Sequence, residues 1–318
     1  MQAVVVRNGA ATVESIADPQ PGDGEVLIKV RLAGICSTDL EIIRGYASFE
    51  GVIGHEFVGT VVSPASKLMG KRVVGEINCV CGRCDMCQSG LSTHCRRRTV
   101  LGIQGRSGCF AEFVCLPEKN CLAVSENVSD EEAVFAEPLA AAFQVLRQAK
   151  LEKRTQVAVV GTGRLGLLVA QVLATTPCRL IAVGRNPKTL SLLDRRGIQA
   201  VTLDQLQRRQ DFDIVVDCTG SSDGLGIAME LVRPRGTIVM KTTCKADHAV
   251  DLTLLVVNEI TLVGNRCGAM GEALNALARK QIDVTSLITR KLPLSEGVQA
   301  IKLAGEPDQI KVLLAGLG

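Results

Sequence analysis

The chain has 318 residues, of which 47% are hydrophobic and 22% are charged, and its formal net charge is +3 at pH 7. This length favours two domains, and so small a charge excludes a partner held mainly by polyanion attraction, such as a nucleic acid. Aromatic residues make up 3%, with no tryptophan, so side chains on which bases or sugars could stack are scarce.

Two segments bear on the cellular compartment. Residues 1–10, MQAVVVRNGA, lack the basic region and cleavage site of a signal peptide, and the longest uncharged apolar stretch, residues 165–178, is too short to span a bilayer. We therefore expect a cytoplasmic protein with no membrane partner. Thiols stay reduced in that compartment, so clustered cysteines are expected to bind metal rather than form disulfides.

Residues 1–125 are predicted to form a β-rich domain. Short segments rich in Val and Ile alternate with turns that contain Gly or Pro, which indicates an irregular, mostly antiparallel arrangement. We expect strands at residues 3–7, 25–34, 54–62, 70–77 and 111–117.

The pattern changes near Asp130. Residues 129–149 begin with an N-cap serine and acidic residues and continue with Ala and Leu, which predicts one helix. Strands and helices then alternate, so we expect an α/β fold with a parallel sheet covered by helices on both faces. The expected strands are 156–161, 179–184, 200–203, 213–220, 236–241 and 260–264, and the expected helices are 164–174, 187–197 and 223–232.

A glycine-rich loop joins the first strand of this alternation to its first helix. Gly161 permits a tight turn, Gly163 lets the backbone approach a pyrophosphate, and Gly166 lets strand and helix pack closely. The helix N-terminus then offers free N–H groups to the phosphates. The alternative is a glycine-rich turn without a ligand. The predicted dinucleotide loop comprises Gly161, Thr162, Gly163, Arg164, Leu165 and Gly166.

The end of the second strand predicts which dinucleotide is bound. An NAD site usually has Asp or Glu there, which binds the 2′-hydroxyl of the ribose. Here Gly184 occupies that place and leaves room for a 2′-phosphate. Arg185 follows, and its guanidinium group could bind that phosphate with two hydrogen bonds. Lys188 adds positive charge. We expect NADP rather than NAD; the alternative is that Arg185 is a solvated loop residue.

Five cysteines lie within residues 79–95. Four of them have the spacing C-x2-C-x2-C-x7-C, whose short loops let four thiolates converge on a tetrahedral zinc ion. Four protein ligands leave no position for a substrate, so this zinc is expected to be structural; an iron–sulfur cluster and reactive thiols are alternatives. Cys79 and His94 break the spacing and are left out. The predicted ligands are Cys81, Cys84, Cys87 and Cys95.

A catalytic metal needs a free coordination position, and its candidate ligands lie outside this cluster. Cys36 follows strand 25–34, and His55 and Glu56 stand in GVIGHEFVG, residues 51–59. A thiolate, an imidazole and a carboxylate would leave the fourth position of zinc open. Spacing alone does not bring these residues together, and a cysteine such as Cys36, taken alone, is more often a buried apolar thiol than a metal ligand.

Several motifs, in this order, resemble those of the zinc-dependent medium-chain alcohol dehydrogenases. The resemblance extends from Met1 to Gly318 and implies a GroES-like catalytic domain, residues 1–138 and 266–318, with a Rossmann domain at residues 139–265. The motifs are GICSTD (34–39), GHEFVG (54–59), the four-cysteine segment, GCFAEFV (108–114), AEPLAAAFQVL (136–146), GTGRLG (161–166) and GNRCG (264–268).

The resemblance implies that Cys36 and His55 bind the catalytic zinc. The third ligand in the polyol, threonine and glucose dehydrogenase-like branch is the Glu of an EPLA segment, which is Glu137 here. Glu56 is the alternative, because in this family it can approach the metal when the ligand set changes. Zinc lowers the pKa of an alcohol and so permits hydride transfer to the nicotinamide.

The same resemblance implies roles for residues in the segment that follows Cys36. Thr38 occupies the position of the hydroxyl that passes the substrate proton to the cofactor ribose, and Asp39 that of a carboxylate that orients the zinc-bound imidazole. Relatives often have a His nearby as the outlet of the relay. None of the three histidines of this chain lies there, so Glu41 or water is expected to serve.

Further cofactor contacts are expected in the Rossmann domain. Cys218 and Thr219 fall at the carboxyl end of a strand, where dinucleotides bind, and Arg266 stands in a motif that resembles a loop beside the nicotinamide. Relatives pair Rossmann sheets edge to edge, which implies a homodimer or homotetramer.

These observations together predict a zinc-dependent oxidoreductase with two zinc ions per chain, one catalytic and one structural. It would transfer hydride between a small-molecule alcohol, or its aldehyde or ketone, and NADP. One alternative is an NAD-dependent polyol, sugar or threonine-like dehydrogenase. Another is a non-catalytic or zinc-free NADPH binder similar to quinone reductases, against which the joint presence of Cys36, His55 and Glu137 argues.

Overall fold

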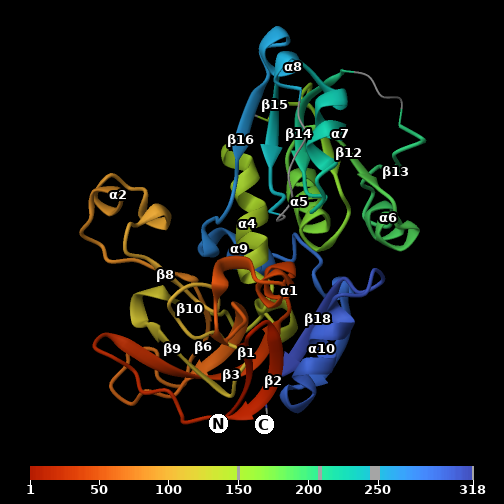
Figure 1. The fold of residues 1–318 in the computed structure, drawn as a ribbon. Coiled ribbons are helices and arrows are strands. Elements are labelled where there is room, and N and C mark those ends of the chain that lie inside the picture. Colours follow the sequence, from red (N-terminus) through yellow and green to blue (C-terminus); the bar gives the residue numbers. More distant parts are fainter. Residues whose placement is uncertain (149–150, 207–209, 244–250, 317–318) are drawn as a thin grey trace. The chain divides into compact units, whose positions relative to one another are not determined.

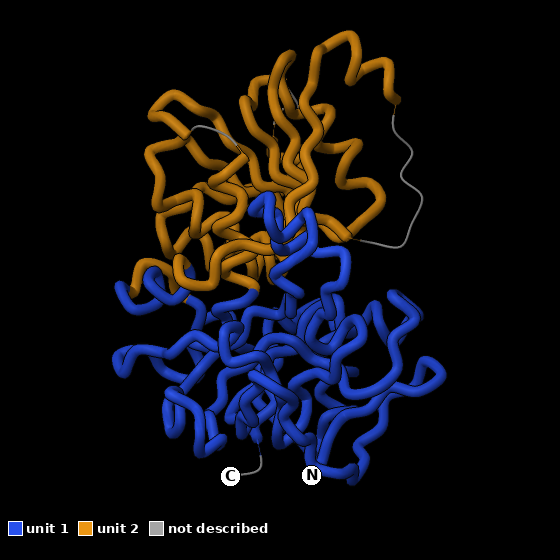
Figure 2. Tube along the Cα trace, turned by 90° about the vertical axis from the view of Figure 1, so that its left-hand side faces the viewer, with its two compact units in different colours: residues 1–137, 273–279, 284–318 blue, residues 138–272, 280–283 orange. Residues whose placement is uncertain are grey.

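The computed structural model describes residues 1–148, 151–206, 210–243 and 251–316 (Figure 1). The chain forms two compact units (Figure 2). Unit 1 comprises residues 1–137, 273–279 and 284–318, and unit 2 comprises residues 138–272 and 280–283. In the described part of the chain, no helix has both the length and the apolar character that crossing a membrane requires.

Unit 1 is built around strand β3 (Glu25–Gly34). Its residues are alternately buried, as expected for a strand with one face toward the core, and Val26, Ile28, Val30 and Leu32 are buried. It pairs antiparallel with β5 (Glu56–Val61), β9 (Phe113–Pro117) and β18 (Lys311–Ala315). The strand that comes last in the chain therefore lies beside one of the first.

The other elements of unit 1 are short and mostly antiparallel, as the sequence predicts. The strand order is β10-β6-β5-β3-β18-β17 in the large sheet, and β2-β1-β4 and β7-β8 form two small ones. These elements are β1 (Gln2–Arg7), β2 (Ala10–Ser15), α1 (Ser37–Ile43), η1 (Tyr46–Ser48), β4 (Gly51–Val52), β6 (Arg72–Gly75), β7 (Asn78–Cys79), α2 (Asp85–Gln88), η2 (Ser92–His94), β8 (Thr99–Val100), η3 (Glu118–Asn120), β10 (Cys121–Ala123), η5 (Thr285–Leu287), β17 (Ile288–Pro293), η6 (Leu294–Glu296) and α10 (Gly297–Ala304).

Unit 2 contains a parallel sheet with the strand order β13-β12-β11-β14-β15-β16. The chain runs outward from β11 on one side and restarts at β14 on the other, and a dinucleotide binds at such a reversal of strand order. The predicted α/β class is confirmed. The elements are β11 (Gln156–Val160), α5 (Arg164–Ala174), β12 (Arg179–Gly184), α6 (Pro187–Asp194), β13 (Ala200–Thr202), β14 (Phe212–Asp217), α7 (Gly224–Leu231), β15 (Val232–Met240), α8 (Leu252–Val257), β16 (Thr261–Gly264) and α9 (Met270–Ala278), which continues into unit 1.

The single helix predicted for residues 129–149 is wrong. The segment forms α3 (Asp130–Ala133), α4 (Ala136–Phe143) and the 3-10 turn η4 (Gln144–Arg147), and its last residue lies outside the described ones. Pro138 explains the break, since it has no N–H to donate and its ring would clash with the carbonyl four residues earlier. It is tolerated in the first turn of α4, where that N–H has no helical partner.

Candidate active site

Cys36, His55 and Glu56 meet in unit 1. The Cys36 sulfur, a nitrogen of His55 and a carboxylate oxygen of Glu56 all lie within 4.8 Å of one another. Strand pairing brings them together, because Gly34 at the end of β3 is the partner of Glu56 at the start of β5. A thiolate, an imidazole and a carboxylate at this spacing fit a zinc ion.

Asp39 contacts two members of this group, His55 and Cys36. One of its carboxylate oxygens lies 3.2 Å from His55 Nδ1, which leaves Nε2 for a metal. The other accepts a hydrogen bond of 2.8 Å from the backbone N–H of Cys36, as part of the capping box of α1. Burial of His55 disfavours its charged form, but Asp39 and Cys36 outweigh this and raise its pKa well above the ordinary value.

Lys311 is a buried charge beside this group that the sequence analysis missed. Its ammonium donates to Glu56 Oε2, and the two side chains are 3% and 1% exposed. It also lies 5.3 Å from the centre of the Phe135 ring. Glu56 Oε1 is buried and has no hydrogen-bond partner among the described residues, which suits an oxygen that a metal ion would satisfy. The only sequence signal was a lysine opening the apolar strand KVLLA.

Glu137 is outside the group of three, although it lies near enough to interact with His55. It is half-buried in the first turn of α4. Burial raises its pKa to about 7, with Glu56 and Glu76 adding to the shift and His55 and Lys311 opposing it. A carboxyl group so disposed to hold a proton would become a better ligand once a cation lowered its pKa.

Thr38 and Glu41, the residues of the predicted proton path, lie on α1. Thr38 is half-buried, and its hydroxyl lies 3.6 Å from Cys36 Sγ. Glu41 instead accepts a hydrogen bond of 2.7 Å from Arg44. The structure thus places Thr38 beside the Cys36 thiol, and Glu41 is engaged with the guanidinium group of Arg44.

Cys81, Cys84, Cys87 and Cys95 form a second group, whose sulfur atoms lie within 4.8 Å of one another. Backbone N–H groups, that of Arg83 first, and the thiols of Cys95 and Cys84 lower the pKa of Cys81 to about 6, so one thiolate is available at neutral pH. Cys79 is apart from this group and accepts a hydrogen bond of 3.7 Å from Asn120. Four converging thiols suit a tetrahedral zinc ion with no open position.

The glycine loop of unit 2 has the geometry that a dinucleotide needs. Gly161 has a φ of +97°, and a Cβ there would come within 2.7 Å of the backbone of Cys218 and Thr219. A Cβ on Gly166 would lie 1.8 Å from the carbonyl oxygen of Gly161. Gly163, by contrast, is exposed, and no atom of the described residues lies within 4 Å of a Cβ placed there, so the N-terminus of α5 is open to a phosphate.

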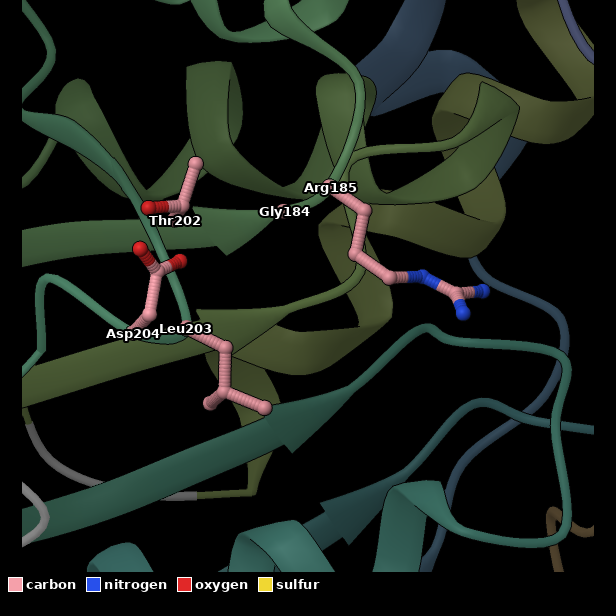
Figure 3. A pocket seen from close by; sticks show the side chains of 5 residues that line it. All are labelled: Gly184, Arg185, Thr202, Leu203 and Asp204. Atoms are coloured by element: carbon pink, nitrogen blue, oxygen red, sulfur yellow. The ribbon is translucent and has the colours of Figure 1, made fainter.

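A cavity of about 340 Å³ lies at the ends of β12 and β13 (Figure 3). Gly184 and Arg185 line it from one side, and Thr202, Leu203 and Asp204 from the other. In Figure 3 the Arg185 side chain extends away from Asp204. The residues that line the cavity thus include both a cationic one, Arg185, and an anionic one, Asp204. Lys188 does not line it; its backbone N–H donates to the Asn186 side chain at the start of α6.

Two family profiles match the chain. One is described as "Alcohol dehydrogenase GroES-like domain" and matches residues 22–126, and the other as "Zinc-binding dehydrogenase" and matches residues 165–281. The chain belongs to the zinc-dependent medium-chain alcohol dehydrogenases. It is accordingly an enzyme that acts on alcohols or polyols with a nicotinamide cofactor.

Individual relatives span nearly the whole chain. An L-threonine 3-dehydrogenase from Chelativorans sp. (strain BNC1) is 29% identical over 325 residues, which covers 94% of each chain. A zinc-binding dehydrogenase from Sinorhizobium meliloti 1021, solved bound to NADP, has a TM-score of 0.90 and 25% identity over 99% of this chain and 98% of its own. An alcohol dehydrogenase (rspB) from E. coli CFT073, solved with NADH, has a TM-score of 0.89 and 27% identity over 99% of both chains.

A second buried lysine of this dehydrogenase, Lys241, also escaped the sequence analysis. Lys241 directly follows β15. Its ammonium group donates to the carbonyl oxygens of Ala141 at 2.9 Å and Arg266 at 2.8 Å, and to Asn265 Oδ1 at 2.8 Å. A Cβ on Gly268 would lie 1.9 Å from the carbonyl oxygen of Ala140. The segment 265–268, which carries the predicted cofactor contact Arg266, is thus held closely against the last turns of α4.

Proposed function

We propose that this dehydrogenase oxidises an alcohol, or reduces the corresponding aldehyde or ketone, with zinc bound by Cys36 and His55 and with NADP as cofactor. The observation that carries this is the convergence of a thiol, an imidazole and a carboxylate within 4.8 Å. Zinc bound there would act as a Lewis acid that lowers the pKa of an alcohol hydroxyl.

The residues around the metal have separate tasks in this proposal. Cys36 and His55 bind zinc, Asp39 holds the His55 ring in place through Nδ1, and Thr38 takes the proton of the substrate hydroxyl into a relay. Glu56 or Glu137 completes the ligand set, directly or through water. Lys311 holds one Glu56 oxygen, so Glu56 reaches the metal only with its other oxygen or by leaving Lys311.

Metal content tests the ligand assignment. We expect two zinc ions per chain in the wild type and one in each of two variants, Cys36→Ser and Cys84→Ser. Because several kcal/mol of transition-state stabilisation would be lost with the catalytic ion, Cys36→Ser should lower kcat/KM by about 1,000-fold or more. A wild type with one zinc, or a Cys36→Ser enzyme that keeps its activity, contradicts the proposal.

The preference for NADP is supported by Gly184 and Arg185 at the cavity of Figure 3. A guanidinium group can bind a 2′-phosphate with two parallel hydrogen bonds, and a glycine leaves that phosphate room. The second candidate is an NAD-dependent polyol, sugar or threonine-like dehydrogenase. Asp204 favours it, because an exposed carboxylate in the same cavity could accept hydrogen bonds from ribose hydroxyls and would repel a phosphate.

A panel of alcohols, aldehydes and ketones with each of the four nicotinamide forms decides between these candidates. The readout is the absorbance of the reduced nicotinamide. We expect kcat/KM to be at least about tenfold higher with NADP⁺ than with NAD⁺, and Arg185→Ala to remove most of that ratio. Equal or better activity with NAD⁺ supports the second candidate, and no turnover with any substrate contradicts both.

We also propose that the enzyme is a homodimer or a dimer of dimers. Among the described residues β16 pairs with β15 alone, so its other edge is free to pair with a second copy. Leu262 on this strand is 43% exposed. Leu262→Lys should therefore produce monomers in light scattering, and an unchanged mass would place the interface elsewhere.

A further inference from the structure

The glycine at position 184 is imposed by the side chain of Thr162. Gly184 is buried at the end of β12, and a Cβ on it would lie 2.0 Å from Thr162 Oγ1 and 2.8 Å from Thr162 Cγ2. The three nearest heavy atoms all belong to the Thr162 side chain. No contact below 3.0 Å is tolerated by a real Cβ, so any other residue at 184 requires Thr162 to move.

Thr162 is poorly able to move. It is 5% exposed, as is Thr189 on α6, and the two hydroxyl oxygens lie 2.8 Å apart. The Thr189 hydroxyl donates its single proton to the carbonyl oxygen of Asn186 at 2.9 Å. Thr162 is therefore the donor to Thr189. Rotating the β-branched Thr162 side chain would break this bond and leave a buried hydroxyl unpaired.

The same chain of hydrogen bonds fixes the segment that carries Arg185. It runs from Thr162 in the glycine loop, through Thr189, to the backbone of Asn186, the residue after Arg185 and the N-cap of α6. These hydrogen bonds thus join the loop that is expected to meet the pyrophosphate to the loop that is expected to meet the ribose.

We propose that Thr162 determines the cofactor selectivity of this enzyme without contacting the distinguishing group of the cofactor. It prevents a carboxylate at position 184, the place where an NAD site has one, and through Thr189 it positions the backbone on which Arg185 stands. This inference rests on the proposed NADP-preferring function. Its consequence is that an acidic residue at 184 can bind the 2′-hydroxyl only after Thr162 has been replaced by a smaller residue.

The test is a set of double-variant cycles on the full-length, zinc-loaded enzyme. Gly184→Asp is combined with Thr162→Gly, which removes all three obstructing atoms, or with Thr162→Val, which keeps their bulk but not the hydroxyl. Without cofactor, we expect Gly184→Asp alone to lower the Tm by about 5 °C or more. Thr162→Gly should restore most of this loss, measured against its own single variant, and Thr162→Val should restore none.

Binding of NADPH and NADH, followed by nicotinamide fluorescence, completes the test. Relative to Thr162→Gly alone, the Gly184→Asp/Thr162→Gly variant should bind NADPH at least about tenfold more weakly, because the new carboxylate repels the phosphate, and NADH more tightly. If Gly184→Asp does not fold, Gly184→Ala takes its place in the melting cycle, since it introduces the same Cβ without a charge.

Two results would overturn the inference. One is additive Tm changes, which mean that Thr162 does not obstruct position 184. The other is a rescue by Thr162→Val equal to that by Thr162→Gly. A wild type that binds NADH better than NADPH would instead refute the proposed cofactor, and the melting cycle would still decide whether Thr162 excludes a side chain at 184.

Discussion

Replacing Lys311 by methionine should strongly destabilise unit 1. The side chains of Lys311 and Glu56 are 3% and 1% exposed, so water cannot solvate the carboxylate once the ammonium is gone. Breaking a buried pair by removing one partner costs about 3–5 kcal/mol. Methionine keeps most of the aliphatic stem, so little of the loss comes from packing. The contact of the ammonium with the Phe135 ring, at 5.3 Å, is lost as well.

A double-variant cycle isolates the ion pair. Glu56→Gln removes the charge that Lys311→Met leaves unpaired, so the double variant should be more stable than the sum of the two single losses predicts, by at least about 2 kcal/mol. Stability is measured by urea denaturation followed by circular dichroism, after chelation, so that a bound ion does not compensate the freed carboxylate.

Lys291→Met provides the matched control. This lysine forms an ion pair of 3.0 Å with Glu131 in the same unit, but the two side chains are 46% and 41% exposed. Such surface pairs contribute at most about 1 kcal/mol. The reasoning fails if Lys311→Met costs no more than Lys291→Met, or if the losses from Lys311→Met and Glu56→Gln simply add.

Three other predictions concern single sites. In the metal-free protein the pKa of Glu137 is raised from 4.5 in the unfolded chain to about 7, so between these pH values the folded state binds more protons than the unfolded state. The contribution of Glu137 to the stability of the fold is therefore present below pH 4.5 and is lost as the pH rises to 7. Glu137→Gln should therefore stabilise the chelated protein at pH 8 by about 1–3 kcal/mol but not at pH 4.5, and a gain of equal size at both pH values in urea melts would contradict this. Lys241→Met should raise the KM for the cofactor more than it lowers kcat, because the segment that carries Arg266 loses its hydrogen bond to the ammonium. Steady-state kinetics of Lys241→Arg, which keeps a positive charge, would show whether that charge maintains the KM. Cys84→Ser should lower the Tm, and a thiol reagent should modify the other three cysteines of the four-cysteine group faster than in the wild type. An unchanged rate of modification would argue against an ion shared by these four cysteines.

Local features of the sequence predicted their structures well. The segment that contains Gly161, Gly163 and Gly166 gave the boundaries of α5 correctly, because a tight turn, an open helix N-terminus and an apolar helix face are all encoded within a few residues. The four-cysteine spacing is equally local. The helix predicted for residues 129–149 failed at Pro138, whose effect on the preceding turn outweighed the Ala and Leu pattern.

The parts that could not be predicted depend on contacts between distant segments. Lys311 meets Glu56 only because β18 pairs with β3, a register that no periodicity in either strand reveals. Glu56 rather than Glu137 lies beside Cys36 and His55 because β5 pairs with β3, which is again a contact between distant segments. The obstruction of position 184 by Thr162 depends on how two loops pack, and the sequence of either loop is compatible with a side chain there.

The pairing of β18 with β3 also affects how the protein is made. Lys311 is separated from Glu56 by 255 positions, and the whole of unit 2 is encoded between them. During synthesis, Cys36, His55 and Glu56 therefore leave the ribosome long before the strand that supplies the counter-charge of Glu56 has been made. Translation of unit 1 begins first, yet all of unit 2 is translated before the sheet of unit 1 can close.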